Sequence, residues 1–152
     1  MKLLHFLLIY FFTTSGFSIE SDAYDFEGNK VRLFLAEKKG DKLKLGLEFN
    51  LVRGWKIYWK HPGDSGLPPE INVIGENIKS TPTVRWPLPD ELYEEDIGLT
   101  SRVYYDNVIL PVDININKYT KNLLLNVDFQ ICKEICIPLN TTLNLRLKNE
   151  NY

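Results

Sequence analysis

The sequence predicts an all-β protein, and more narrowly an immunoglobulin-like antiparallel β-sandwich. Three observations lead to this prediction. Apolar and polar residues alternate along several runs, which is typical of strands with one buried face. Turn-forming residues separate these runs, and no part of the chain shows a helical period or an internal repeat. About seven to nine strands are expected, a number that suits a sandwich of this kind.

The first two predicted strands are residues 30–37 and 42–52. In the second of them the apolar side chains share one parity, and they are Leu43, Leu45, Leu47, Phe49 and Leu51. The residues between the strands, Lys39, Gly40 and Asp41, have turn chemistry, so a hairpin is expected. A short aromatic strand is predicted next, at residues 54–59.

The middle of the chain is predicted to be largely irregular. Residues 61–69 are rich in proline and glycine, which break regular structure, so a long ordered loop is expected there. Short extended pieces are predicted at 71–74 and 83–86. Residues 87–105 have no clear strand pattern, and the acidic cluster within them is interpreted as a solvated surface, because its spacing does not match a calcium-binding loop.

Three further strands are predicted at residues 108–116, 123–131 and 143–147. In the middle one the inward side chains are Leu123, Leu125, Val127, Phe129 and Ile131. Cys132 therefore falls on the opposite, polar side of that strand. Cys136 has the same parity if the chain turns tightly and returns.

Residues 1–18 are predicted to be a secretory signal peptide. A lysine precedes an almost unbroken apolar run from Leu3 to Phe12, and the small residues Gly16 and Ser18 follow. A membrane-spanning helix needs roughly 18 or more apolar residues, so cleavage is expected, with no stable membrane insertion afterwards. Residues 19–152 are then expected to form a single domain in the periplasm.

The composition excludes some classes of partner. Removal of Lys2 with the signal leaves 17 basic and 20 acidic side chains. Because no basic face is visible, we expect neither nucleic acid nor anionic lipid as a partner. A hydrophobic fraction of 44% argues against disorder.

The candidate functional residues are Cys132 and Cys136, the two cysteines of the chain. In an oxidising compartment such a close pair is expected to rest as a disulfide. A three-residue loop between paired strands would bring the two Cα atoms to the roughly 5.5–6 Å that a disulfide prefers. The residues alone leave three roles open, namely a redox pair, a structural staple and part of a metal site.

The short loop between the cysteines makes a purely structural role less attractive. A bridge that encloses five residues is expected to stabilise the fold by only about 2 kcal/mol, against roughly 4.7 kcal/mol for a hundred-residue loop. A short, partly exposed bridge is also the kind that exchanges with a partner thiol. Metal ligands are scarce, because His61 is the only histidine outside the predicted signal, although two thiolates and His61 would suit a cuprous ion. We expect no cofactor and no bound metal.

Four ordered motifs place the chain in a recognisable group. They are GWKIYWKHPGDSGLPP at 54–69, VRWP at 84–87, LPV at 110–112 and CKEICIP at 132–138. Together they resemble the periplasmic N-terminal domain of the bacterial thiol:disulfide interchange protein DsbD, and more closely its relatives in the suppressor-of-copper-sensitivity, or ScsB-like, branch. The likeness covers nearly the whole predicted mature chain.

The resemblance implies an immunoglobulin-like domain whose cysteine pair takes electrons from a membrane thiol:disulfide transporter and reduces oxidised periplasmic proteins. It implies that Cys136 forms the mixed disulfide with partners and that Cys132 resolves it. A tyrosine flanking the pair matches Tyr58, and an acidic cap-loop residue falls near Glu94. Two departures from the DsbD branch are the shorter loop between the cysteines and the lack of a shielding cap-loop phenylalanine, for which Ile97 is the nearest apolar candidate.

The function expected from these observations is a periplasmic thiol:disulfide interchange, or electron relay, protein acting through Cys132 and Cys136 as a protein-disulfide reductase component. Because the sequence ends at Tyr152 without a membrane segment or a thioredoxin-like domain, the donor is expected to be a separate protein. Thioredoxin-like or other oxidised periplasmic proteins are the expected clients. The alternatives are a non-catalytic exported binding module with a structural disulfide, and a copper-handling protein.

Overall fold

The structure is a computed structural model that describes residues 19–75, 78–117 and 119–147. The predicted signal peptide, residues 1–18, lies outside the described residues. Eleven strands occur in the described part of the chain. They are β1 (Tyr24–Phe26), β2 (Asn29–Lys39), β3 (Lys42–Asn50), β4 (Lys56–Gly63), β5 (Glu70–Ile74), β6 (Thr83–Val84), β7 (Asp90–Glu94), β8 (Leu99–Tyr105), β9 (Asn107–Asn115), β10 (Asn122–Cys132) and β11 (Cys136–Arg146). Within the same residues, no helix is long and apolar enough to cross a membrane.

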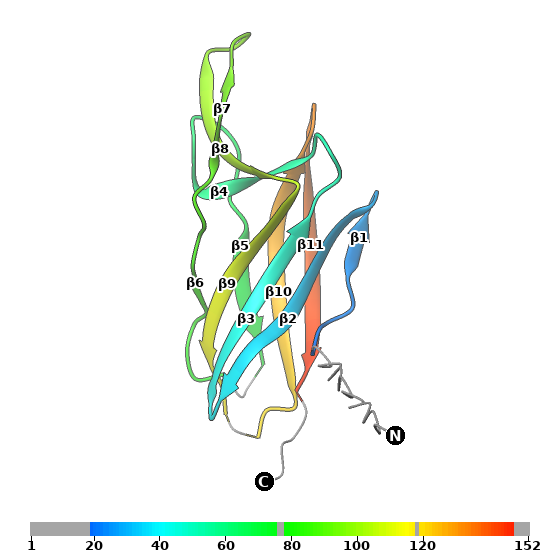
Figure 1. Ribbon diagram of the computed structural model, residues 1–152, viewed down its shortest axis with the longest axis vertical. Helices are drawn as coiled ribbons and strands as arrows, with labels where there is room; N and C mark the ends of the chain where they lie inside the picture. The colour runs from blue at the N-terminus through cyan, green and yellow to red at the C-terminus, as the bar shows by residue number, and fades with distance from the viewer. Residues whose placement is uncertain (1–18, 76–77, 118, 148–152) are drawn as a thin grey trace, which may run out of the picture.

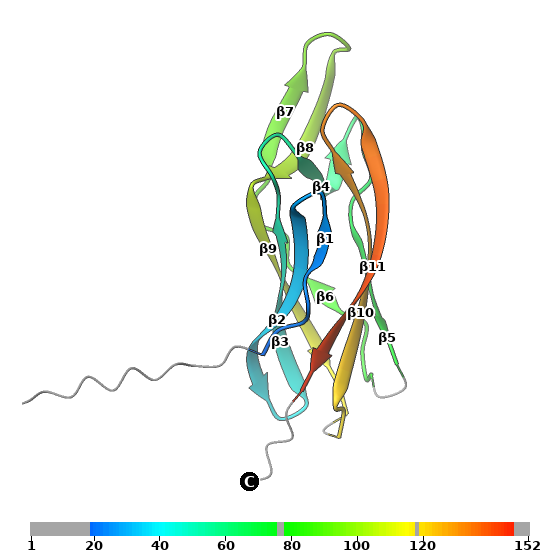
Figure 2. The ribbon, with the colours of Figure 1, turned by 90° about the vertical axis from the view of Figure 1, so that its right-hand side faces the viewer.

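The strands form two antiparallel sheets that pack face to face (Figure 1). One sheet has the order β1-β2-β3-β9-β6, and the other has the order β11-β10-β4-β8-β7, with β5 also paired to β10. Figure 2 shows the two layers from the side, with β2 and β3 in one and β10 and β11 in the other. The predicted immunoglobulin-like β-sandwich is confirmed.

The core lies between the sheets and is built from the alternating residues of the predicted strands. The inward residues of β3 and β10 are all buried, from Leu43 to Phe49 and from Leu123 to Ile131. Phe49 and Phe129 join the two sheets through an edge-to-face contact with ring centroids 5.4 Å apart. The predicted hairpin is also confirmed, because Lys39 and Lys42 are paired across the turn at Gly40, which has a φ of 62°.

The prediction of irregular structure at residues 87–105 is wrong. β7 and β8 pair over residues 90–94 and 99–103, and the amide of Gly98 donates to the carbonyl of Glu94 (2.8 Å) to close the turn. This β7–β8 hairpin projects beyond the end of the sandwich (Figure 1). Because most of β7 stands clear of the core, it has no buried side chain and therefore lacks the alternation that marks a half-buried strand.

The predicted loop at 61–69 is shorter than expected, because β4 continues to Gly63. The ladder between β4 and β8 is interrupted between Tyr58 and Gly63, and the strand carries Pro62 within this irregularity. Proline lacks a backbone donor and is tolerated in a strand where the ladder is broken. The connection between β4 and β5 is left with residues 64–69.

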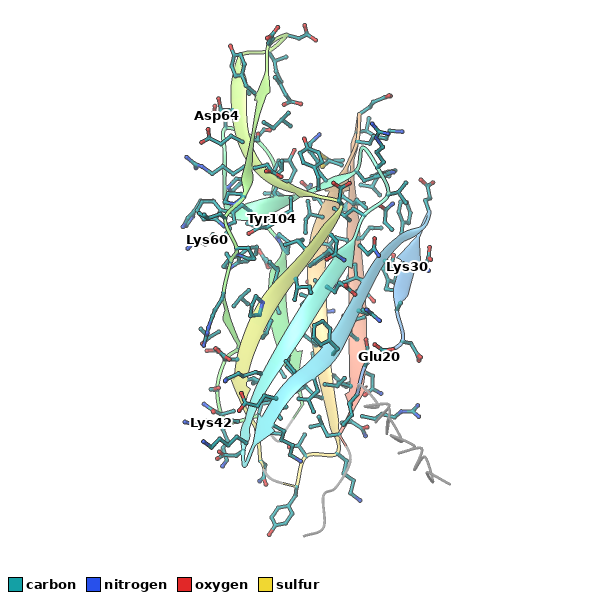
Figure 3. All side chains as sticks on the ribbon, in the orientation of Figure 1. Glu20, Lys30, Lys42, Lys60, Asp64 and Tyr104 are labelled. Carbon is teal, nitrogen blue, oxygen red and sulfur yellow. A yellow bond between two sulfur atoms is a disulfide. The ribbon has the colours of Figure 1, made fainter. Side chains whose placement is uncertain are left out.

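Tyr104, labelled in Figure 3, is expected to make the stability of the fold sensitive to alkaline pH. Its side chain is 4% exposed, and its hydroxyl donates to the carbonyl of Pro87 (2.7 Å). Burial raises the pKa of Tyr104 far above its ordinary value of about 10. The unfolded chain therefore loses this proton near pH 10, while the folded chain keeps it. The free energy of unfolding should then fall as the pH rises above 10, by up to about 1.4 kcal/mol per pH unit.

The measurement is urea unfolding of the disulfide-bonded protein between pH 8 and 11. Tyr104→Phe is the matched variant, because it keeps the ring and removes the titrating group. It should be about 1 kcal/mol less stable at pH 8, through loss of the hydrogen bond, but its stability should fall less steeply above pH 10. Equal slopes for the two proteins would contradict this assignment.

Candidate functional site

Cys132 and Cys136 close the hairpin between β10 and β11 at one end of the sandwich. They are Cα partners in the ladder, and their sulfur atoms form a disulfide. The amide of Lys133 donates to the carbonyl of Ile135 (3.1 Å), so the cysteines occupy the next, non-hydrogen-bonded pair of the ladder. Such pairs are narrow, which explains a Cα separation of 4.1 Å instead of the 5.5–6 Å expected from the sequence.

The two cysteines differ sharply in exposure. Cys132 is 1% exposed and belongs to a small apolar cluster with Tyr58 and Val103. Leu92 of β7 and Tyr105 of β8 pack against this cluster. Cys136 is exposed. Parity correctly predicts that both cysteines point away from the main core, but a second layer of side chains covers Cys132.

Tyr58 connects the disulfide to β4. Its ring is 4% exposed, and its hydroxyl lies 3.9 Å from Sγ of Cys136. It alternates with Ile57, which faces the main core, so Tyr58 stands on the outer face of its sheet together with Cys132. The structure thus brings Tyr58 to the cysteine pair.

The loop from residue 64 to residue 69 holds Tyr58 in place. Asp64, labelled in Figure 3, ties the start of the loop to β8, because its amide donates to the carbonyl of Thr100 (3.0 Å) and its carboxylate accepts from the amide of Thr100 (2.9 Å). Gly66 has a φ of 91°, and its Cα lies against the ring of Tyr58 so closely that a Cβ would stand 2.2 Å from a ring carbon. A residue without a side chain is therefore required there.

Gly66→Ala is expected to destabilise the protein by about 2–5 kcal/mol. The positive φ costs an L-residue roughly 1–2 kcal/mol, and the overlap with Tyr58 adds a typical overpacking cost of about 1–3 kcal/mol. Urea unfolding measures the loss. Gly40→Ala is the control, because Gly40 also has a positive φ, but a methyl group added there would meet nothing within 4 Å. Equal losses for the two variants would rule out a steric contribution from Tyr58.

Lys56 is a site residue that sequence reasoning missed. It is the Cα partner of Cys132 on one side and of Tyr105 on the other. It is 8% exposed, and its Nζ donates to the carbonyl of Lys133 in the cysteine hairpin (3.2 Å). The sequence did contain a sign that Lys56 belongs to the site, because it lies two residues before Tyr58, and residues i and i+2 of a strand share a face.

The β7–β8 hairpin carries Glu94 and Ile97, whose expected cap roles stay predictions. Glu94 ends β7, and its charge, together with that of Asp90, adds to burial in raising the pKa of Tyr105. The residue of β7 that packs on the cluster around Cys132 is Leu92. Ile97 lies in the turn and is 61% exposed, so its expected shielding role stays a prediction.

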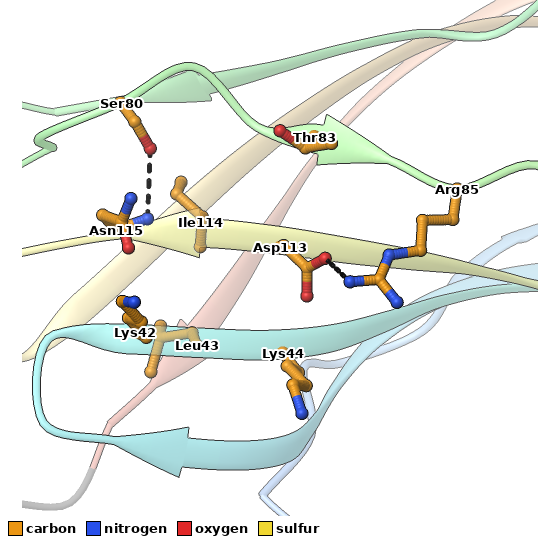
Figure 4. Close-up of a pocket in the computed structure, with 9 residues that line it drawn as sticks. All are labelled: Lys42, Leu43, Lys44, Ser80, Thr83, Arg85, Asp113, Ile114 and Asn115. Atoms are coloured by element: carbon orange, nitrogen blue, oxygen red, sulfur yellow. Dashed lines mark hydrogen bonds and ion pairs between the residues drawn. The ribbon is translucent and has the colours of Figure 1, made fainter.

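The described part of the chain has surface hollows on both sheets, and two of them contain residues discussed above or charged groups. One, about 270 Å³, is on the other sheet across β3, β9 and β6, where Lys42 and Lys44 line it together with an ion pair between Arg85 and Asp113 (Figure 4). β3 begins at Lys42, at the end of the sandwich opposite the turn between β10 and β11 (Figures 1 and 3). The other, about 190 Å³, lies between Leu67 and Pro68 of the loop and Gln130 and Pro138 of the hairpin strands, which are each two residues from a cysteine.

Comparison with known proteins gives one family. The sequence model of the family described as "Thiol:disulfide interchange protein DsbD, N-terminal" matches residues 27–148. No curated protein matches the chain.

The solved structures similar to this fold include the two that follow. The N-terminal periplasmic domain of ScsB from Proteus mirabilis has 26% sequence identity and a TM-score of 0.73, and the match covers 86% of this chain and 52% of that chain. The chain therefore spans about half the length of that structure. The DsbD N-terminal domain of Neisseria meningitidis, in the reduced form, has 14% identity and a TM-score of 0.49, with 77% of this chain and 84% of that chain covered.

Proposed function

The chain belongs to the family of N-terminal domains of the thiol:disulfide interchange protein DsbD, and we propose that it is an exported relay that carries two electrons on Cys132 and Cys136. A membrane thiol:disulfide transporter is the proposed donor, and oxidised periplasmic proteins, thioredoxin-like ones among them, are the proposed clients. The observation that carries the proposal is the asymmetry of the disulfide, with Cys136 exposed and Cys132 buried.

The asymmetry supports Cys136 as the cysteine that a donor attacks. A donor thiolate reaches the exposed Sγ of Cys136 and forms a new S–S bond with it, while the Cys132–Cys136 bond breaks and its electron pair leaves on Sγ of Cys132. The second thiolate of the donor then attacks the donor sulfur of the mixed disulfide and releases Cys136. The donor is oxidised to a disulfide, and the chain holds a dithiol.

Client reduction is the same exchange in reverse. The Cys136 thiolate attacks a client disulfide, and Cys132 then attacks Cys136 and releases the reduced client. The hydroxyl of Tyr58, 3.9 Å from Sγ of Cys136, is placed to donate a hydrogen bond to the thiolate in this state. Charge-assisted hydrogen bonds of this kind favour the ionised form of the acceptor.

The surface around Cys136 suits contact with another protein. Ile135, next to it in the hairpin, is 71% exposed, and Leu67 of the neighbouring loop is 60% exposed. Leu67 lines the smaller hollow together with Pro138, which has the same parity as Cys136 on β11. Exposed apolar side chains that surround a reactive atom are typical of a docking surface.

The test is a redox titration of the intact protein in glutathione buffers, with folding followed by circular dichroism. The disulfide should be reduced reversibly while the spectrum of the fold is retained. A variant with both cysteines replaced by serine should stay folded, lose about 2 kcal/mol of stability and transfer no electrons to oxidised glutathione. Reduction that takes place only under conditions that unfold the wild-type protein would refute the relay and favour a structural staple.

A further inference from the structure

We propose that Lys56 is a positioning residue of the thiol exchange, whose ammonium group holds the cysteine hairpin through the carbonyl of Lys133 and supplies positive charge beside Cys132 when that sulfur leaves as a thiolate. The inference rests on the proposed relay function. It assigns to a buried lysine of β4 a role in the redox equilibrium of the cysteine pair.

The position of Lys56 is set by the sheet. Lys56 and Cys132 are directly opposite in the pairing of β4 with β10, and side chains of such partners point to the same face with Cβ atoms roughly 4.5–5.5 Å apart. The Nζ atom lies 3.2 Å from the carbonyl oxygen of Lys133, the residue that follows Cys132. The ammonium group is therefore next to the backbone that carries the buried sulfur.

A buried lysine needs partners for its ammonium group inside the protein. Among the described residues, Lys56 is the only charged residue in the buried class. Removal of an ammonium group from water is costly unless it gains partners inside the protein, and lysine is seldom buried without them. A carbonyl group is one such partner, and a thiolate that forms during each exchange is a second.

The charged and titratable groups around the cysteine pair come from four elements. They are Lys133 and Glu134 of the cysteine hairpin, Lys56 and Tyr58 of β4, Tyr105 of β8, and Asp90 and Glu94 of β7. Lys133 and Glu134 are exposed, so water and salt screen their charges. Asp90 and Glu94 act on Tyr105, which stands between β7 and Lys56 in the sheet. The positive charge that is least screened at Cys132 is that of Lys56.

The chemistry needs such a charge at the buried sulfur. When the Cys132–Cys136 bond breaks, the electron pair goes to Sγ of Cys132 inside the cluster with Tyr58 and Val103. Burial in apolar surroundings disfavours a thiolate, whereas a neighbouring lysine favours it. The lower the pKa of the thiol that acts as the leaving group, the faster it leaves in the exchange. Lys56 thus favours both the exchange step and the reduced form of the pair.

The test compares Lys56→Met with Lys56→Arg. The first variant keeps a long unbranched side chain and removes the charge, and the second keeps the charge and the hydrogen-bond donor. Lys60→Met is the control, because Lys60 is an exposed lysine of the same strand. The measurements are the equilibrium with glutathione between pH 5.5 and 9 and the pH profile of thiol alkylation by iodoacetamide. Urea unfolding reports any structural loss separately.

At pH 8 and above, Lys56→Met should lower the equilibrium constant for reduction about tenfold, which is about 30 mV for a two-electron couple. The difference should shrink toward pH 5.5, because the charge of Lys56 affects the equilibrium only to the extent that the thiols are ionised, and the alkylation profile should move to higher pH. The equilibrium constant of Lys56→Arg should stay within about threefold of the wild-type value. That of Lys60→Met should equal the wild-type value.

A Lys56→Met variant that loses stability but keeps the wild-type glutathione equilibrium and alkylation profile would overturn the inference and leave Lys56 a purely structural residue. Failure of the relay itself looks different. In that case the wild-type disulfide would resist reduction until the protein unfolds, whatever residue stands at position 56.

Discussion

In a Cys132→Ala variant, the remaining thiol of Cys136 should form mixed disulfides at least about tenfold faster than the thiol of Cys132 does in Cys136→Ala. The reason is access. The remaining sulfur of the first variant is exposed, whereas that of the second is covered by Tyr58, Val103 and the side chains packed on them. Attack on a buried thiol requires local opening of the structure, and the rate falls with the population of the open state.

The two variants are well matched, because each loses the same disulfide and one sulfur atom. Their reaction with a small aromatic disulfide, followed by absorbance, measures the difference. In concentrated urea the two thiols should react at rates within about threefold of each other, which separates the effect of the fold from intrinsic reactivity. Equal rates in the native proteins would remove the basis for assigning the partner-linked role to Cys136.

A relay has to keep its fold in both redox states, and the short cysteine loop suits this requirement. Five residues are enclosed by the bridge, since Cys132 and Cys136 are four apart in sequence. Loss of such a bridge costs only about 2 kcal/mol, a modest part of the 5–15 kcal/mol typical of a domain. The hairpin also keeps its ladder below the cysteines, where β10 and β11 stay paired down to Asn122 and Arg146. The dithiol form should therefore be as well folded as the disulfide form.

The sandwich could be predicted from the sequence where strands have one buried face. β3 and β10 are examples, because every second residue enters the core and leaves a period of two in the sequence. β7 left no such signal, since Asp90, Glu91 and Glu94 face solvent or the rim of the cysteine cluster, and it is held by pairing with β8. The extension of β4 past His61 was hidden by Pro62 and Gly63, whose usual effect is to end a strand.

The site was predictable only in part, for a related reason. The cysteines and their shared parity are visible in the sequence, and the matching family motif points to Tyr58. The burial of Cys132 is not visible, because it depends on Leu92 of β7 and Tyr105 of β8, two strands that the sheet order separates from β10 by β4. Lys56 was marked only by its spacing of two residues from Tyr58, and its burial is hidden, since a lysine beside aromatic residues in a strand is normally expected to face water. Each of these features is set by tertiary packing and not by local pattern.

Phe49→Ala should cost about 3–5 kcal/mol of stability, the usual range for loss of a buried aromatic ring. Phe49 is 0% exposed, and its ring meets that of Phe129, so truncation opens a cavity between β3 and β10. Ile109→Ala is the control on the neighbouring strand, because Ile109 is 40% exposed and points away from the core, and its cost should be below about 1 kcal/mol. Urea unfolding of the disulfide-bonded proteins gives both values.

The same variant tests whether the two faces of β10 act independently. Phe129 and Cys132 lie on opposite faces of that strand, one in the core and the other in the outer cluster. The equilibrium of folded Phe49→Ala with glutathione should therefore stay within about twofold of wild type, since effects at sites without shared partners are nearly additive. A tenfold change would mean that core packing under β10 sets the redox equilibrium of the cysteine pair, and that the side chains on the outer face, Tyr58 and Lys56 among them, do not control it alone.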